Sequence, residues 1–235
     1  MRDRTGCMPQ RDDDIYASAP LRRLLDAQTC VLKPELQRCF GTHALLLGAS
    51  FGDAPPALPM LGCWATLHLA NGRYQGDLRA AADEPLPFID DAFELVLLRH
   101  ALEVAPLPAA LLDEAVRVLA PGGVLALTGV HPFGGWSPWF YWRMRGKSPA
   151  LQMPWRLRRR LELAGLMIEQ VQRVGSMWPS LAATRQAIAG AFGGGYVLVA
   201  RKRRHMVTPL RLKPAPVRVP TNGRLSPGTR RSSAL

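Results

Sequence analysis

The stretch from Leu86 to Gly129 constrains the fold more than any other part of the chain, because it has the pattern of a β-α-β unit. FELVLL, residues 93–98, is a short apolar run suited to a buried strand. Apolar residues then recur at helical spacing over 109–119, and the Pro-Gly-Gly at 121–123 ends that helix. VLALTGV, residues 124–130, predicts a second buried strand. Strand, crossover helix and strand indicate a parallel sheet, so we expect an α/β fold.

The same block resembles a known family. LPF, FELV, HALE and a helix ending in RVLAPGG resemble the second half of a class I S-adenosylmethionine-dependent methyltransferase of the type 11 kind. GVHPFGGW and, near the end, GGGYVLVARKRR resemble segments of a bacterial subgroup, most of whose members have no assigned substrate. The resemblance covers about residues 40–204. It implies a Rossmann-like, doubly wound, seven-stranded and mostly parallel sheet, with S-adenosylmethionine as cofactor.

The first strand and its turn, residues 42–51, carry the glycine motif that the resemblance assigns to the cofactor. The family usually has an acidic residue and three alternating glycines here. This chain has Leu46 at the acidic position, followed by Gly48, Ser50 and Gly52. The resemblance implies that Gly48, Ser50 and Gly52 line the cofactor. Prolines at 55, 56 and 59 argue against a long helix after this turn.

Later strand ends supply the other candidate cofactor contacts. The predicted strand at 64–70 is followed by Asn71, where the family has a carboxylate on the ribose hydroxyls, and the Asn71 amide could replace one hydrogen bond. Asp83, or alternatively Asp77, takes the family's acidic position beside the adenine, although both could be exposed loop carboxylates. Arg99 follows the apolar strand at 93–98 and faces the predicted pocket.

His100, beside Arg99, is the one catalytic candidate. It could act as a general base, or it could pack beside the thioether of the cofactor. Methyl transfer depends mainly on positioning, so no catalytic residue is required. The four cysteines, at 7, 30, 39 and 63, have neither a CxxC pair nor zinc-site spacing, so no metal site is predicted. Scattered thiols, with no signal peptide or apolar span, predict a cytoplasmic protein.

Aromatic residues concentrate between His131 and Trp155, which holds four of the six tryptophans. Trp136, Trp139 and Tyr141 are the candidate substrate-binding residues, because the segment follows the fifth strand, where related enzymes insert substrate-covering elements. Two alternatives stay open. The aromatic residues could form a small core of their own, or, with the neighbouring arginines, a surface for a membrane or a nucleic acid.

Charge divides the chain into a nearly neutral body and a basic end. The first 200 residues hold 20 cations and 18 acids, whereas the last 35 hold ten cations and no acid. We therefore predict a flexible N-terminus at 1–17, a methyltransferase-like domain at 18–204 with an aromatic and basic insertion at about 131–160, and a disordered basic tail at 205–235. The tail could solubilise the chain or make weak nonspecific contact with nucleic acid or an acidic surface.

Two hypotheses of function follow from these features. The first is an S-adenosylmethionine-dependent methyltransferase that acts on a small molecule. The second is a catalytically inactive protein of the same fold that serves as a binding or scaffolding module, which Leu46 and the missing carboxylate after Ala70 favour. Nucleic-acid binding through the tail is a third hypothesis. A leading helix at 20–32 could cover the cofactor or be an ordinary surface helix.

Overall fold

The structure is a computed structural model that describes residues 15–145, 149–179 and 193–204. These residues belong to one compact unit, residues 1–205. The predicted tail at 205–235 lies outside the described residues. The predicted boundary of the flexible N-terminus at residue 17 is wrong, because Ile15–Ala17 form the 3₁₀ helix η2 and Ile15 and Tyr16 pack into a hydrophobic cluster. Residues 1–14 lie outside the described residues.

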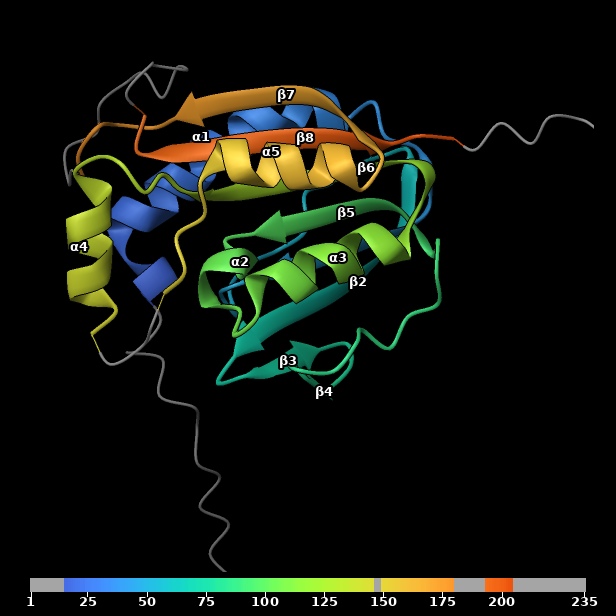
Figure 1. Cartoon of the computed structure of the whole chain (residues 1–235), viewed down its shortest axis with the longest axis horizontal. Helices are drawn as coiled ribbons and strands as arrows, with labels where there is room; N and C mark the ends of the chain where they lie inside the picture. Colours follow the sequence, from blue (N-terminus) through green and yellow to red (C-terminus); the bar gives the residue numbers. More distant parts are fainter. Residues whose placement is uncertain (1–14, 146–148, 180–192, 205–235) are drawn as a thin grey trace, which may run out of the picture. The chain divides into compact units, whose positions relative to one another are not determined.

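A single mixed sheet organises the unit (Figure 1), with the strand order β4-β3-β2-β1-β5-β6-β8-β7. The four central strands, β2, β1, β5 and β6, are parallel, while β8 is antiparallel to both β6 and β7. The predicted α/β, mostly parallel architecture is therefore confirmed. The strands are β1 Gly41–Gly48, β2 Leu61–Ala70, β3 Arg73–Gly76, β4 Ala80–Ala81, β5 Phe93–Arg99, β6 Leu119–Val130, β7 Leu166–Val174 and β8 Gly195–Lys202.

The helices cover the two faces of the sheet. They are α1 Ala19–Leu36, α2 Ala101–Val104, α3 Pro108–Val118, α4 Trp136–Arg143 and α5 Pro154–Leu163. Figure 1 shows α3 and α5 on one face and α1 on the other. Three of them (α1, α3 and α5) have a proline at the first or second position, where the missing N–H has no helical partner to lose. The helix predicted over 109–119 is α3, and it ends one residue earlier, at Val118, because Leu119 already pairs with Phe93.

The sheet has eight strands instead of the predicted seven, because β2 turns directly into an antiparallel β3. Asn71 and Gly72 both have positive φ angles, 52° and 70°, as a two-residue type I′ turn requires. Ala70 then pairs with Arg73, and β4 continues the meander. The Asn-Gly pair was a hairpin signal that sequence analysis treated only as a strand end.

The crossover from β1 to β2 contains no helix. Residues 49–60 run from one parallel strand to the next without one, as the three prolines predict. Leu58 is the only large apolar side chain that this connection buries. The connection therefore presents a glycine turn without the helix N-terminus that commonly follows it in nucleotide-binding α/β folds.

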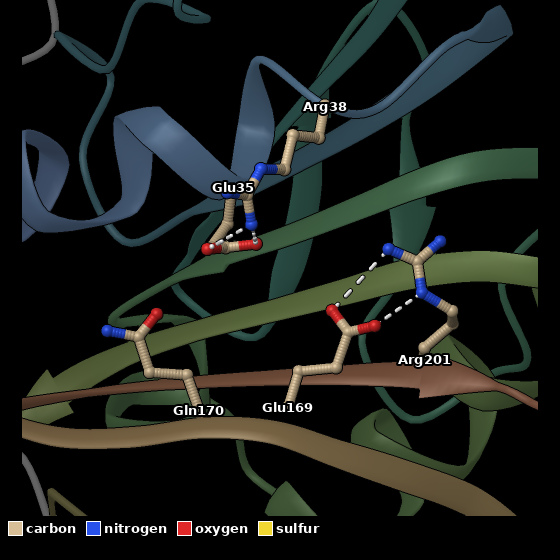
Figure 2. A pocket seen from close by; sticks show the side chains of 5 residues that line it. All are labelled: Glu35, Arg38, Glu169, Gln170 and Arg201. Atoms are coloured by element: carbon tan, nitrogen blue, oxygen red, sulfur yellow. Dashed lines mark hydrogen bonds and ion pairs between the residues drawn. The ribbon is translucent and has the colours of Figure 1, made fainter.

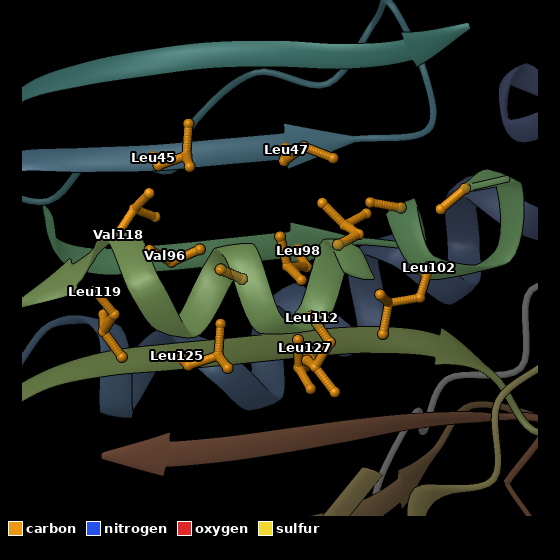
Figure 3. Close-up of a cluster of buried hydrophobic side chains, with 14 of the residues drawn as sticks. Leu45, Leu47, Val96, Leu98, Leu102, Leu112, Val118, Leu119, Leu125 and Leu127 are labelled. Carbon is orange, nitrogen blue, oxygen red and sulfur yellow. The ribbon is translucent and has the colours of Figure 1, made fainter. Parts of the chain in front are cut away.

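The core has three parts. One cluster packs between the sheet and helices α3 and α5; Figure 3 shows part of it, where Leu45, Val96 and Leu125 from neighbouring strands meet α3. A second lies between the sheet and α1. The third closes the end of the sheet where the parallel strands finish, and it joins η2, the start of α1, and α4. Its buried members are Ile15, Tyr16, Leu21, Leu24, Val130, Trp136, Phe140 and Met144.

Candidate functional site

The glycine turn lies where β1 meets the end of β5. Gly48 forms a bridge with His100, and the Ala49 N–H donates to the Arg99 carbonyl at 3.0 Å. Inside the turn, the Gly52 N–H donates to Ser50 Oγ at 3.2 Å, and Ser50 is buried. Five of the predicted site residues (Gly48, Ser50, Gly52, Arg99 and His100) are thus brought together at the carboxyl ends of two adjacent parallel strands. This is the edge where open α/β sheets bind ligands.

An ion pair covers the glycine turn. Arg99 and Asp53 lie 3.6 Å apart and both are largely buried. A Cβ atom at Gly48 would lie 2.5 Å from Asp53 Oδ2, so the carboxylate occupies the open side of this glycine. The arginine is held as well, since it donates to Thr29 Oγ1 in α1 at 2.5 Å and to the Ala54 carbonyl at 3.2 Å. In the described conformation Asp53, rather than a free surface, faces the turn.

His100 belongs to a buried polar network that sequence analysis did not anticipate. Its Nδ1 lies 3.0 Å from Glu103 Oε2, and its Nε2 lies 2.8 Å from Gln28 Oε1. The Gln28 amide nitrogen donates to the carbonyls of Gly129 and Tyr196, which fixes the orientation of the amide. Both ring nitrogens therefore lie within hydrogen-bond distance of a side-chain oxygen. A ring that is 1% exposed, with both nitrogens engaged, is not placed to take a proton from a substrate.

Glu103 anchors the same network. One carboxylate oxygen accepts hydrogen bonds from the Tyr16 hydroxyl at 3.0 Å and from His100, and the other accepts from the Val130 N–H. The nearby carboxylate and complete burial raise the pKa of Tyr196 well above its ordinary value, with burial the larger cause. His100 has a left-handed backbone, φ 54°, which is costly for a non-glycine residue. The network supplies the fixed geometry that holds it there.

No strong sequence signal marks this network. Gln28 lies one helical turn from Leu24 and from Leu32, so its position on the buried face of α1 could have been inferred from spacing. Glu103 and Tyr16 come from α2 and η2, and their meeting with His100 depends on the tertiary fold.

Asn71 and Asp83 lie at the end of β2, beyond the glycine turn. Gly48 pairs with His68, and β2 then continues to Ala70 and the Asn71 turn. The Ala82 N–H donates to the Gly72 carbonyl at 3.0 Å, which brings Asp83 to the same hairpin. Both side chains are exposed. Asp77, the alternative to Asp83, accepts a hydrogen bond from the Thr66 N–H at 2.6 Å and so has a structural role.

The aromatic segment divides into a buried part and an exposed part. Trp136 is 2% exposed, and its indole nitrogen donates to the Ser176 carbonyl at 2.8 Å. The prediction that Trp136 binds substrate is corrected by this burial, because its ring packs in the third cluster. Trp139 is half-buried and makes an edge contact with Trp136, while Tyr141 is 50% exposed.

Two open hollows lie away from the glycine turn. The first, about 370 Å³, is polar and is formed by α1, β7 and β8 at the opposite end of the sheet. Figure 2 shows that its charges are paired with one another, Arg38 with Glu35 and Arg201 with Glu169. The second, about 410 Å³, is apolar and lies along the prolines at 55–59 and the start of β2. Neither contains a predicted site residue.

Comparison with known proteins points to one class. Residues 63–127, from β2 to β6, match the methyltransferase domain family. No curated protein sequence matches the chain.

Solved structures show the same fold. An S-adenosylmethionine-dependent methyltransferase from Archaeoglobus fulgidus has a TM-score of 0.52 at 14% identity, covering 77% of this chain and 94% of that one. Those from Thermotoga maritima and Mesorhizobium loti each have a TM-score of 0.50 at 16% identity. They cover 77% and 75% of this chain and 94% and 98% of their own.

The fold is therefore that of the class I methyltransferases, open and mostly parallel with an antiparallel β8. Within that fold class, residues 63–127 are similar to the methyltransferase domain family, whose solved neighbours here are S-adenosylmethionine-dependent methyltransferases. The family implies S-adenosylmethionine as the cofactor.

The polar groups beside the glycine turn in β2 and β6 fit a polar ligand such as that cofactor. Buried side-chain atoms that have no hydrogen-bond partner among the described residues flank the turn, at His68 Nδ1 in β2 and Thr128 Oγ1 in β6. Such atoms normally find a partner, so a polar ligand at this edge would meet unfilled donors or acceptors. The other side is filled by Asp53, which has to leave Gly48 before a ligand can reach the turn.

Proposed function

We propose that the protein binds S-adenosylmethionine at the carboxyl ends of β1, β2 and β5 and methylates a small-molecule substrate. The observation that carries this proposal is the position of the methyltransferase-domain match. Residues 63–127 contain the carboxyl ends of β2 and β5. The glycine turn lies beside the end of β5, and the unpartnered atoms His68 Nδ1 and Thr128 Oγ1 lie in β2 and in the neighbouring β6. When bound, the cofactor supplies an electrophilic methyl group.

The chain's own residues would bind and orient the cofactor and the substrate. Gly48, Ser50 and Gly52 would offer backbone groups at the turn, and Arg99 would exchange Asp53 for a ligand carboxylate. Asn71 and Asp83 would hydrogen-bond the nucleoside part from the exposed hairpin. His100 would act as a positioning residue, since its ring holds Gln28 and Glu103 behind the turn. Trp139 and Tyr141 would contact the substrate from α4.

A second candidate is a protein of the same fold that no longer transfers methyl groups. The Asp53–Arg99 pair over Gly48 favours it, as do the absence of a helix after the turn and the neutral Leu46 and Ala70 at the two strand positions where the family has acids. A hydrogen bond to a charged group contributes about 1.5–3 kcal/mol, so losing one weakens binding by roughly 10- to 150-fold.

Calorimetric titration with S-adenosylmethionine and S-adenosylhomocysteine separates the two. We expect the wild-type protein to bind and Asp83→Ala to bind more weakly, whereas Asp53→Ala binds more tightly because the turn is cleared. Asp90→Ala is a matched control, an exposed carboxylate paired with Arg117 away from the site. Absence of binding by both the wild type and Asp53→Ala at millimolar ligand would refute the methyltransferase proposal and leave the second candidate.

For the basic tail we propose only a weak, nonspecific contact with nucleic acid or an acidic surface. Binding of this kind falls steeply with salt, so titrating a labelled oligonucleotide between low and high salt tests it. Among the described residues, no helix is long and apolar enough to cross a membrane.

A further inference from the structure

Exposed aromatic side chains gather at the end of the sheet that α4 covers. Helix α4 turns Trp136, Phe140 and Met144 inward, at a spacing of four, and this leaves Tyr141 and Trp142 on its outer side. Their exposures are 50% and 57%. Large rings at such exposure are unusual for a surface that contacts only water. We call this the aromatic end surface, formed by Phe133, Tyr141, Trp142, Met177 and Trp178.

Contacts tie the members of this surface together. The Trp178 ring lies so close to Gly135 that a Cβ there would overlap it, which places Trp178 against the start of α4. Arg173 donates to the Phe133 carbonyl at 3.0 Å, linking that loop to β7. Met177 precedes Trp178 and is also half exposed. These contacts place Trp178 at the start of α4 and hold the Phe133 loop to β7, while Tyr141 and Trp142 lie farther along the same helix.

The two segments that carry the patch, 131–143 and 173–178, contain no acidic residue. Residues 131–160 contain seven arginines and lysines and no acid, and no acid follows Glu169 in the chain. Arg143, the last residue of α4, and Arg145 two residues later have exposed side chains and form no ion pair with a described residue. At the same end of the sheet (Figure 1), the second residue of α5 is Trp155, and the Arg156 guanidinium lies 5.2 Å from the centroid of its ring. The patch is complementary to an anionic partner.

We propose that the aromatic end surface binds the headgroup layer of an anionic lipid membrane. Tryptophan and tyrosine rings favour this layer because one edge is apolar and the other polar, and the arginines add attraction to acidic headgroups. A nucleic-acid strand would need a positively charged groove to follow. The two hollows described above lie elsewhere, and the exposed rings of α4 project from a helix surface instead of lining a channel. The proposal shares only Tyr141 with the proposed substrate contacts, and its test measures vesicle binding, so it does not depend on methyl transfer.

Vesicle binding by the full chain tests this proposal. Vesicles of phosphatidylcholine are compared with vesicles that contain about one third phosphatidylglycerol, by co-sedimentation and tryptophan fluorescence. The variant Tyr141→Ser/Trp142→Ser removes the outer rings of α4. The matched control, Phe40→Ser/Met60→Ser, removes two side chains of similar exposure near the start of β1 and β2, at the other end of the sheet. Circular dichroism confirms that both variants fold.

We expect binding to the anionic vesicles, weakened at least about fivefold in the α4 variant and unchanged in the control. Wild-type affinity in the α4 variant would overturn the proposal and assign the binding to charge elsewhere, such as the ten cations after residue 200. Lack of binding to anionic vesicles would also overturn it. Two further results would overturn it, if vesicle binding does not depend on Tyr141 and Trp142. One is binding of a single-stranded oligonucleotide that does depend on these two rings, and the other is self-association, seen by light scattering, that does.

Discussion

A few residues at the carboxyl edge of the sheet form a buried network of hydrogen bonds. Glu103 accepts from three donors while 1% exposed, and Gln28 and His100 complete the set. A buried charge is tolerated only when its partners are in place. The network therefore fixes η2, α1, α2 and the end of β6 relative to one another, because each contributes one of its members.

Replacing Glu103 with glutamine should destabilise the protein strongly. The amide keeps the shape but presents an NH₂ group to donors and removes the charge that faces His100. Leaving a buried donor without its acceptor costs about 1–3 kcal/mol, and Glu103 accepts from Tyr16, His100 and Val130, so the free energy of unfolding from urea titration should fall by at least about 2 kcal/mol. Glu162→Gln, in an exposed pair with Arg158, is the control and should cost under about 1 kcal/mol. Equal effects of the two substitutions would contradict this account.

A second prediction at this scale concerns His131, whose pKa is lowered first by burial and then by Arg173. Its Nδ1 accepts hydrogen bonds from Arg173 and from the Phe133 N–H, and both depend on the neutral ring. An unfolded histidine titrates near 6.5, so this group's contribution to stability is present above that pH and is lost as pH falls toward the lowered pKa.

The variant Arg173→Gln tests the role of the arginine. We expect it to raise the pKa of His131 toward its ordinary value, as measured by NMR titration of the ring. Arg38→Gln, an exposed arginine paired with Glu35 at the other end of the sheet, should leave the His131 titration unchanged. An unshifted His131 in the Arg173 variant would show that burial alone sets the pKa.

At the scale of elements, α4 depends on close approach to a glycine. A Cβ at Gly194 would overlap the Trp136 ring, and Trp136 is almost fully buried. We expect Gly194→Ala to lower the free energy of unfolding by about 1–3 kcal/mol through overpacking. At Gly52 a Cβ would find its nearest neighbour 3.7 Å away, so Gly52→Ala is the control. Similar stabilities of the two variants, by chemical denaturation, would contradict the packing described for Trp136.

Elements were easier to predict from the sequence than the contacts between them. Periodicity alone locates β5 and α3, because FELVLL and the helical spacing after it are local properties. The Asp53–Arg99 pair joins residues 46 positions apart, and nothing near either residue signals the other. The burial of Trp136 likewise depends on Gly194 and Ser176, which come from distant segments. Strand ends in the sequence predicted which candidate residues would lie together at the glycine turn, but they did not predict that Asp53 would cover Gly48.

For the whole molecule, all three core clusters are formed by residues between 15 and 200. We therefore expect a chain that ends at Arg204 to keep the thermal midpoint of the full chain within about 2 °C, by calorimetry. Its calorimetric enthalpy should also stay close to that of the full chain. A decrease of 5 °C or more would show that later residues support the core, since 1 kcal/mol shifts the midpoint of a domain of this size by about 2–4 °C.

The position of β8 has a consequence for how this protein is made. The last strand of the sheet in sequence order lies between β6 and β7 and pairs with both along their length. A nascent chain on the ribosome that has reached β7 still lacks the strand through which β7 joins the sheet, and the open edge of β6 stays available to other chains. Productive folding must therefore wait until residue 202 has left the exit tunnel, and slow translation between β7 and β8 would lengthen the period at risk of aggregation.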